Sequence, residues 1–315
     1  MDNLTHTLVG LMLARTGLGK ETPRAAGLMM LAANAPDIDV ISWFGGTPAY
    51  LDYHRGYTHA LAFVPIVALL PMTLVRAKFS WRVYAAAVIG VLSHLMLDFT
   101  NIYGVRLFLP FSARWQRLDM TDVVDPWIWL VLILGVLIPR FFRPNGGVSR
   151  GPARMAAWVV LVALLGYEGT RYAFHRRALQ MIAAQMDSRQ TVECITAVPD
   201  RFDPRRWRGI VETGDAVEIL PLNLSRPYDP EATRVDEIQP RNEAMIVATQ
   251  SRAFRALVRF SQLPYWRTSS VTNGTRVELI DLRFGTPENP GLEAEAIVDP
   301  SSKVIFTGVG FGPPR

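Results

Sequence analysis

The chain has 315 residues, of which 50% are hydrophobic, and a net charge of +5 at neutral pH. Its single cysteine, Cys194, excludes a disulfide framework within the chain and any cysteine-rich metal site. The basic residues lie in short loops between apolar blocks rather than in one patch, so no nucleic-acid partner is expected.

The first half of the chain is a series of apolar blocks, and four of them suggest membrane spans. Each is shorter than the roughly 20 residues that cross a bilayer comfortably. Two weaker blocks precede them and are expected to form short or re-entrant helices. We therefore predict a mainly α membrane domain, a bundle of about four to six short transmembrane or re-entrant helices. The four blocks cover 60–75, 83–97, 127–139 and 156–167, and the weaker two cover 4–14 and 25–44.

Basic loops between these blocks predict how they are oriented. Such loops tend to stay on the cytoplasmic side of a membrane. The histidines and most of the aspartates lie at the opposite ends of the blocks, so we expect them on the non-cytoplasmic face, together with the second half of the chain. The basic stretch at 106–117 does not fit this pattern. The loop residues are Arg15, Lys20, Arg24, Arg76, Lys78, Arg82, Arg140, Arg143, Arg150 and Arg154.

From about Arg171 onward, apolar and charged residues alternate. Helices are expected at 172–186 and 243–260, and "IVETGDAVEIL" and "EAEAIVD" are typical of strands. Asn273 and Gly274 precede an alternating strand and predict a hairpin. The expected division is a membrane-embedded helical metal-site domain at 1–170, followed by a small, β-rich α+β soluble domain at 171–315.

The clearest local pattern is "SHLMLD", in which His94 and Asp98 are four positions apart within a helical block. This spacing places both side chains on one helix face, about one turn apart. The pair can bind one metal ion, or the imidazole and the carboxylate can hydrogen-bond to each other. Ionisable residues inside a membrane helix are costly and tend to be functional, which favours the metal interpretation.

Two more histidines occur in "HRGYTH", where His54 and His59 are five positions apart. They do not share a helix face, but a turn at Gly56 would let both rings point to one centre. The alternative is an interfacial loop with solvated rings. Arg55 is expected either to hold an anionic group of a substrate or to pair with Asp52.

In "NAPDID", Asp37 and Asp39 follow a proline, which disfavours helix at Ala35. Both acids are candidate metal ligands. The alternative is that either one caps the segment from Ile38. His6, in the first apolar block, is a further candidate with no pattern of its own.

Four histidines and at least three aspartates thus converge on one end of the predicted bundle. Histidine nitrogen with carboxylate oxygen suits zinc, with manganese or iron as alternatives. More ligands are present than one tetrahedral ion needs, which points to two ions. Such a site acidifies bound water and so favours hydrolysis of esters or phosphodiesters.

In chain order, "THTLVG", "APDID", "HRGYTH" and "SHLMLDFTN" resemble the YdjM-like, LexA-binding, inner-membrane-associated family of metal-dependent hydrolases. The resemblance covers residues 1–170 and implies a bacterial inner-membrane protein, distantly similar to zinc-dependent phospholipases C. It implies that Asp39 is either a ligand or a residue behind the ligands, and Asn101 matches the polar position after the His–Asp helix. The implied metal ligands are His6, Asp37, His54, His59, His94 and Asp98.

Together these features predict a multi-pass, membrane-bound, zinc-dependent hydrolase of the phosphodiesterase or phospholipase type. Its substrate would be a phosphodiester or other ester of a lipid or envelope component, attacked by metal-activated water. Asp39 would accept a proton, and Arg55 would hold the substrate. Membrane lipids and a small-molecule or lipid ester are the expected partners, and the oligomeric state is open. Two alternatives stay open: a non-catalytic assembly or regulatory protein with a structural metal, and a metal or proton transporter.

Overall fold

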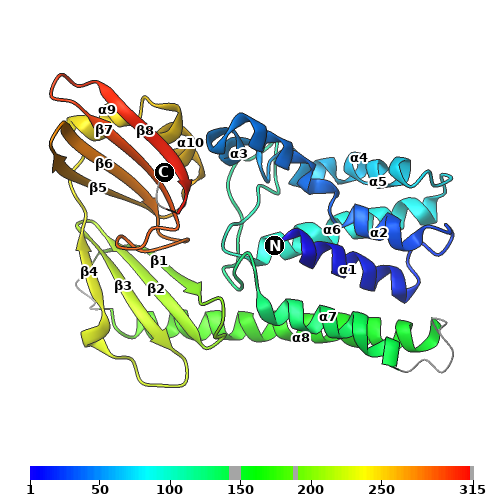
Figure 1. Ribbon diagram of the computed structural model, residues 1–315. Coiled ribbons are helices and arrows are strands. Elements are labelled where there is room, and N and C mark those ends of the chain that lie inside the picture. Colours follow the sequence, from blue (N-terminus) through cyan, green and yellow to red (C-terminus); the bar gives the residue numbers. More distant parts are fainter. Residues whose placement is uncertain (142–149, 187–190, 313–315) are drawn as a thin grey trace.

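A computed structural model describes residues 1–141, 150–186 and 191–312. Helices occupy one side of the molecule and two β-sheets the other, and the long helix α8 runs from the first group to the second (Figure 1). The helical region contains α1 (Asn3–Thr16), α2 (Ala25–Ala32), the 3₁₀ helix η1 (Ala35–Gly45), α3 (Thr47–Tyr53), η2 (Tyr57–His59), η3 (Leu61–Phe63), α4 (Val64–Val67), α5 (Leu69–Leu74), α6 (Trp81–Thr100), α7 (Pro126–Phe141) and α8 (Arg150–Ala183).

Helix α1 has well-defined ends. The side chain of Asp2 caps its first turn by accepting hydrogen bonds from the backbone N–H groups of Leu4 and Thr5. Gly17 ends the helix in the left-handed conformation, with φ of 112°, which a residue with a Cβ rarely adopts. These ends place His6 in the second turn of α1, inside the protein.

Helix α6 packs closely against α2 through small residues. A Cβ added to Gly90 would lie 2.6 Å from Cβ of Ala32, so the two helices approach as closely as they do because this position is glycine. Ala87 and Val91 are buried in the same cluster as Leu28 of α2. This close approach sets the position of the next turn of α6, which carries His94.

The predicted bundle of several short membrane spans is wrong. Among the described residues, α6 is the one helix long and apolar enough to cross a membrane, or one of two if 47–59 and 61–74 count as a single bent span. Those two segments meet at 58°, and Pro65 and Pro71, which lack backbone N–H groups, lie within the second. Helix α7 has 16 residues, and α8 carries charges along much of its length. Half of the apolar window of α6 is buried inside the protein.

The second half of the chain forms two four-stranded antiparallel sheets, each with its strands in chain order. Residues 210–220, expected to form strand structure, belong to two strands joined by a turn. The hairpin predicted at Asn273 and Gly274 is present. The first sheet contains β1 (Val192–Pro199), β2 (Arg206–Thr213), β3 (Ala216–Asn223) and β4 (Arg234–Glu237), and the second contains β5 (Pro264–Val271), β6 (Gly274–Asp281), β7 (Leu292–Val298) and β8 (Val304–Phe311).

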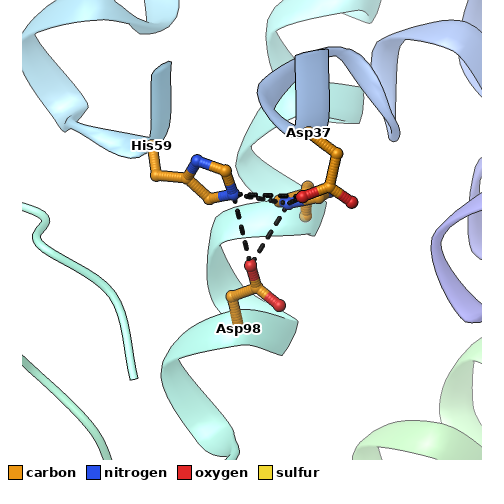
Figure 2. Close-up of side chains that lie close together, drawn as sticks. Asp37, His59 and Asp98 are labelled. Carbon is orange, nitrogen blue, oxygen red and sulfur yellow. Dashed lines mark hydrogen bonds and ion pairs between the residues drawn. The ribbon is translucent and has the colours of Figure 1, made fainter. Parts of the chain in front are cut away.

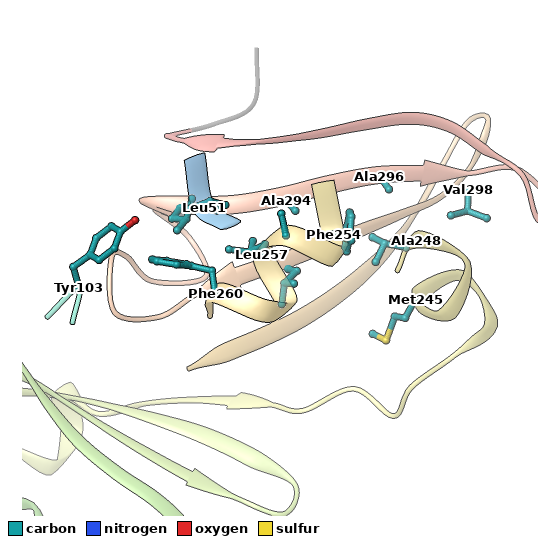
Figure 3. Packing of buried hydrophobic residues seen from close by; sticks show 14 residues of the cluster. Leu51, Tyr103, Met245, Ala248, Phe254, Leu257, Phe260, Ala294, Ala296 and Val298 are labelled. Atoms are coloured by element: carbon teal, nitrogen blue, oxygen red, sulfur yellow. The ribbon is translucent and has the colours of Figure 1, made fainter. Parts of the chain in front are cut away.

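Two short helices cover one face of the second sheet. The single helix expected at 243–260 is divided into α9 (Glu243–Ala248) and α10 (Arg252–Phe260), because Ser251 caps α10 at its first turn. A short 3₁₀ helix, η4 (Pro230–Ala232), precedes β4. Leu51 and Tyr103 of the helical region pack into the same hydrophobic core as Phe260 (Figure 3).

Side-chain contacts, as well as the chain itself, join the helical region to the sheets. Helix α8 continues through residue 170, where the domain boundary is expected, so no break in structure marks that position. The carboxylate of Asp52 in α3 accepts hydrogen bonds from Arg259 in α10, the shortest at 2.7 Å. Arg55 therefore does not pair with Asp52, which was one of its two expected roles.

Candidate metal centre

Three separate elements bring four potential metal ligands together. Helix α6 contributes His94 and Asp98, η2 contributes His59, and η1 contributes Asp37. One ligand atom from each of these residues lies within 4.8 Å of the others, and all four residues are buried. Figure 2 shows the imidazole of His59 and the carboxylates of Asp37 and Asp98 turned toward one another. These four residues are called the His–Asp cluster below.

Five of the six separations between these atoms are compatible with ligands around one tetrahedral ion. Nε2 of His59 and Nε2 of His94 are 3.1 Å apart. Oδ1 of Asp37 lies 3.4 Å and 3.5 Å from these two nitrogens, and Oδ2 of Asp98 lies 3.5 Å and 3.2 Å from them. Tetrahedral ligands at roughly 2.0–2.1 Å from zinc are separated from each other by about 3.3 Å. The five separations therefore fit an ion of this size.

Contacts behind the ligands orient both imidazoles. Nδ1 of His94 lies 2.7 Å from the carbonyl oxygen of Ala33, to which it donates when that nitrogen is protonated. Nδ1 of His59 lies 3.1 Å from Oδ2 of Asp39. If Nδ1 carries the proton, both arrangements would leave the Nε2 lone pair for a metal ion, as in many metal sites where a carboxylate or carbonyl supports the ligating histidine.

A second group of possible ligands shares Asp37 with the cluster. It consists of Asp37, Asp39 and His54, again with ligand atoms within 4.8 Å of one another. Both oxygens of Asp39 are already engaged, one by Nδ1 of His54 at 2.7 Å and the other by the backbone N–H of Arg55 and the hydroxyl of Thr58. These contacts suit a positioning role for Asp39, and the expectation that it accepts a proton stays a prediction.

His6 lies beside the cluster without belonging to the group of four. Its ring stacks on that of His94 with centroids 3.7 Å apart, and its Nε2 is 3.4 Å from Oδ1 of Asp98. Both ring nitrogens are buried without a hydrogen-bond partner among the described residues. Burial, followed by the neighbouring charge of His94, lowers the pKa of His6 to about 3, so the ring is neutral and has a lone pair to offer.

Arg55 is buried against the cluster. Its Nη2 lies 2.9 Å from Oδ1 of Asp98, and its Nη1 donates to Oδ1 of Asn101 and to the carbonyl oxygen of Gly104. The amino group of Met1 contacts the same carboxylate oxygen. The negative charge of Asp98 is therefore neutralised by neighbouring cations. Asn101 holds Arg55 in place by accepting a hydrogen bond from it.

A small cavity of about 160 Å³ reaches the centre from one side. Asp37, His54 and Arg55 line it, together with the rings of Tyr50 and Tyr103. The cavity gives a small molecule access to the second group of ligands and to the guanidinium of Arg55. It is large enough for the reacting group of a substrate, with room for several waters but not for a whole lipid.

Comparison with known proteins places this arrangement in a family. The profile of the YdjM inner membrane protein family matches residues 1–177, which include every residue of the candidate centre. The chain belongs to the YdjM inner membrane protein family. The match does not bear on the expected LexA binding or on the distant similarity to phospholipases C, and both stay predictions.

Two relatives show how far the YdjM similarity extends. YfhP of Bacillus subtilis (strain 168) is 25% identical over 302 residues, which cover 90% of this chain and 87% of YfhP. Inner membrane protein YbcI of Escherichia coli (strain K12) is 30% identical over 165 residues, which cover 42% of this chain and 95% of YbcI. The similarity to YfhP therefore includes the β-sheets. No solved structure matches the chain.

Charges within this YdjM family centre keep its acids ionised. Burial raises the pKa of Asp37, but the charge of His94 and the contact with His59 outweigh this effect and hold the pKa below its usual range. Asp39 behaves in the same way, because His54 and His59 hydrogen-bond to its carboxylate and lower its pKa. Ionised carboxylates are the form that binds metal ions.

Some residues of the centre could not be recognised in the sequence. Tyr103 stacks edge-on against His54, with centroids 5.7 Å apart, and its ring lies 4.4 Å from the guanidinium of Arg55. Thr58 donates its hydroxyl to Asp39 at 2.7 Å. Thr58 lies inside "HRGYTH" and so could have been suspected, whereas Tyr103 has no local pattern that distinguishes it from a core tyrosine.

Proposed function

We propose that this protein is a membrane-bound, metal-dependent hydrolase of phosphodiesters or other esters, with zinc as the favoured ion and manganese or iron as alternatives. The single observation that supports it most is the His–Asp cluster, whose donor separations of 3.1–3.5 Å suit a tetrahedral ion. An ion held by all four side chains would supply an acidified water at neutral pH only if its coordination expanded to include that water.

In this proposal the residues of the chain have distinct tasks. His59, His94, Asp37 and Asp98 hold one ion, and His54 with Asp37 offers a place for a second. Asp39 keeps the rings of His54 and His59 in their orientation, and it is the group closest to both that could take a proton. The second ion rests on the position of Asp37, which belongs to both groups.

Arg55 favours an anionic substrate. Its Nε is buried without a hydrogen-bond partner among the described residues, and the side chain lines the small cavity. A planar guanidinium binds phosphate or carboxylate oxygens well. A phosphodiester in that cavity would meet both the arginine and the ligands of the second group, and a lipid of the surrounding membrane is a ready source of such a group.

The second candidate is a non-catalytic protein in which the metal supports the structure. One observation favours it: His59, His94 and Asp98 are completely buried, and structural sites are closed to water. A transporter is less supported, because the ligands gather in one place instead of being distributed across the membrane depth. The cavity at Arg55 favours the hydrolase over both.

We also propose that the centre and the sheets face the non-cytoplasmic side, with more than one pass through the membrane. The connections between α1 and α2 and between α5 and α6 lie at the end of the helices remote from the sheets (Figure 1). They carry Lys20, Arg24 and Lys78, and Arg15 lies in the last turn of α1. Basic loops favour the cytoplasm. Arg143, part of the third basic loop, lies outside the described residues.

Labelling of Cys194, a half-buried thiol in β1, tests this orientation. A membrane-impermeant maleimide should label it in intact cells. Labelling that occurs only after the cells are lysed would contradict an external location for the sheets.

Metal analysis of the purified protein tests the site. We expect bound zinc or a similar ion in the wild type and loss of most of it in the double variant His94→Ala, Asp98→Ala. His175→Gln is the matched control, because His175 is the histidine outside the centre and packs near Trp207. Metal retained by the double variant would show that the ligands have been assigned wrongly.

Turnover tests the reaction. The protein in phospholipid nanodiscs should hydrolyse bis(4-nitrophenyl) phosphate or phosphatidylglycerol with added zinc or manganese, and a chelator should stop the reaction. The double variant should be inactive and His175→Gln active. Metal binding without any chelator-sensitive turnover on these substrates would favour the structural candidate instead.

A further inference from the structure

A cavity of about 530 Å³ lies in the sheet region, and the proposed hydrolase makes no use of it. Strands β1, β2 and β3 line it, together with the loop that follows β6 and with Ile102, which follows α6. Its volume is in the range of small-ligand sites, roughly 300–1,000 Å³. Ile102, Val198, Ile219 and Phe284 form an apolar part of the wall.

The rest of the wall is strongly basic. The charged residues that line it are Arg201, Arg206, Arg208, Arg234, Arg283, Asp122 and Asp200. Four of the arginines have carboxylate partners: Asp122 for Arg201, Asp203 for Arg206, Asp236 for Arg234 and Asp281 for Arg283. These pairs compensate one another, and Asp200 adds a further negative charge to the wall. Arg208 is therefore distinguished by the absence of a carboxylate bonded to it among the described residues, and not by an excess of positive charge in the cavity.

Arg208 has no carboxylate partner among the described residues. Its Nη2 donates to the carbonyl oxygens of Leu282 at 2.9 Å and Arg283 at 3.2 Å. Its Nε is buried and has no hydrogen-bond partner in the described part of the chain. Asp122, the acid whose charge acts on it, is already bonded to Arg201 at 3.0 Å. Because this guanidinium is partly exposed in the cavity wall, an anion that enters the cavity could pair with it.

We propose that this cavity binds a small amphiphilic anion. A phosphate or carboxylate group would pair with Arg208, and an apolar group would lie against Ile219 and Phe284. The same chemistry is present in an anionic lipid headgroup region and in a soluble organic anion. The proposal does not depend on the hydrolase function, because neither Arg208 nor the other lining residues belong to the metal centre.

Hydrogen bonds connect the wall of the cavity to the segment beside the metal centre. Arg283, in its wall, donates to the carbonyl oxygens of Ile102 and Tyr103. Tyr103 in turn covers the guanidinium of Arg55. An anion that draws Arg283 or Ile102 would therefore act on the segment that follows α6.

Phenyl phosphate is a suitable probe, because it joins a phosphate to an apolar ring. The full chain is placed in phosphatidylcholine nanodiscs, freed of metal with a chelator and dialysed, so that binding at the metal centre does not contribute. Calorimetric titration should show saturable binding of phenyl phosphate, with weaker binding of inorganic phosphate and of phenol. Absence of saturable binding would overturn the proposal.

Arg208→Gln should weaken the binding of phenyl phosphate roughly tenfold or more, since it removes a charge-assisted hydrogen bond. Arg255→Gln is the control, because Arg255 is an exposed residue of α10 outside the cavity. Equal affinity of Arg208→Gln and the wild type would also overturn the proposal.

A second variant keeps the test decisive if Arg208→Gln does not fold. Ala232 lines the cavity from an exposed position, so Ala232→Trp should fill the space without disturbing the core and should abolish binding. Binding that persists in Ala232→Trp would locate the anion elsewhere and contradict the proposal.

A comparison of lipids distinguishes the two sources of the anion. If the natural ligand is a lipid, phosphatidic acid in the nanodiscs should compete and weaken the apparent affinity for phenyl phosphate at least several-fold in the wild type. If it is a soluble anion, the affinity should be unchanged. This comparison identifies only what fills the site, and the variants Arg208→Gln and Ala232→Trp test whether the site is the cavity.

Discussion

The guanidinium of Arg55 lies 2.9 Å from the carboxylate of Asp98, and both side chains are buried. Arg55 also adopts a φ of 56°, which is uncommon for a residue with a Cβ. Its contacts with Asn101 and Gly104 hold it in this conformation. The amino group of Met1 contacts the same carboxylate oxygen of Asp98 as this arginine.

Arg55→Gln should therefore destabilise the metal-free protein, and zinc should restore part of the loss. Removing one partner of a buried ion pair costs about 3–5 kcal/mol, because the other charge stays buried and unpaired. A dication at the His–Asp cluster would neutralise Asp98 in its place. Thermal unfolding, followed by tryptophan fluorescence with and without zinc, measures both effects.

The control for this experiment is Arg259→Gln, which breaks the more exposed pair with Asp52. It should lower stability by no more than about 1 kcal/mol and show the zinc response of the wild type. If zinc stabilises Arg55→Gln no more than it stabilises the wild type, Asp98 does not bind the ion.

Asp39→Asn should weaken zinc binding without removing a ligand of the His–Asp cluster. The carboxylate orients His54 and His59, and loss of such a supporting group commonly costs ten- to a hundredfold, roughly, in metal affinity. Competition with a chromophoric chelator measures the change. Asp52→Asn is the matched control, because this nearby acid contacts Arg259 and not the histidines. Unchanged affinity in Asp39→Asn would show that the imidazoles are held in place by other contacts.

Gly90→Ala should separate α6 from α2 and disturb His94. The added Cβ would lie 2.6 Å from Ala32, and overpacking of this kind costs roughly 1–3 kcal/mol. Because His94 bonds to the carbonyl of Ala33, zinc affinity should fall as well. Calorimetric unfolding and zinc titration measure the two changes.

Gly166→Ala provides the comparison, since no atom lies within 4 Å of the added Cβ. In an open position within α8, the better helix former should be neutral or should stabilise by up to about 1 kcal/mol. Similar destabilisation by both substitutions would indicate that the contact between α2 and α6 is not the cause.

Glu293 should make the stability of the sheets depend on pH. Burial, together with the charges of Glu278 and Glu295, raises the pKa of this β7 carboxyl to about 7. Between its ordinary pKa in the unfolded chain and about 7, the folded state holds a proton that the unfolded state has released, so stability falls as pH rises through this window.

Glu293→Gln mimics the protonated form and should flatten this part of the profile. The melting temperature of the variant should exceed that of the wild type near pH 8 and approach it near pH 5, given a folded-state pKa of about 7. A constant difference between the two proteins from pH 5 to pH 8 would contradict the raised pKa.

Local patterns predicted which candidate ligands lie close together better than they predicted the number of membrane spans. His94 and Asp98 could be paired from their spacing, because the geometry of a helix places positions four apart on one face. The turn in "HRGYTH" was also expected, although Arg55 and not Gly56 takes the positive φ. The count of membrane spans was wrong because apolar residues fill protein cores as well as membranes, and half of the apolar window of α6 is buried in the protein.

The partner of Arg55 could not be predicted in this way. Asp52 was the obvious candidate because it is close in sequence, yet it bonds to Arg259, while Arg55 reaches Asp98. Which acid meets which arginine depends on how α3, α6 and α10 pack, and no local pattern carries that information.

The sequence by itself indicated which histidines and aspartates are candidate metal ligands, since these residue types and their local spacings occur in short motifs. It also determined the family and the presence of strands in the second half. Only the tertiary structure decided which ligands share one centre, because Asp37, His59 and His94 come from three elements whose relative positions depend on helix packing. That Nε of Arg208 has no hydrogen-bond partner among the described residues likewise emerged only from the structure. It depends on which side chains surround Arg208 in space, and these come from many parts of the chain.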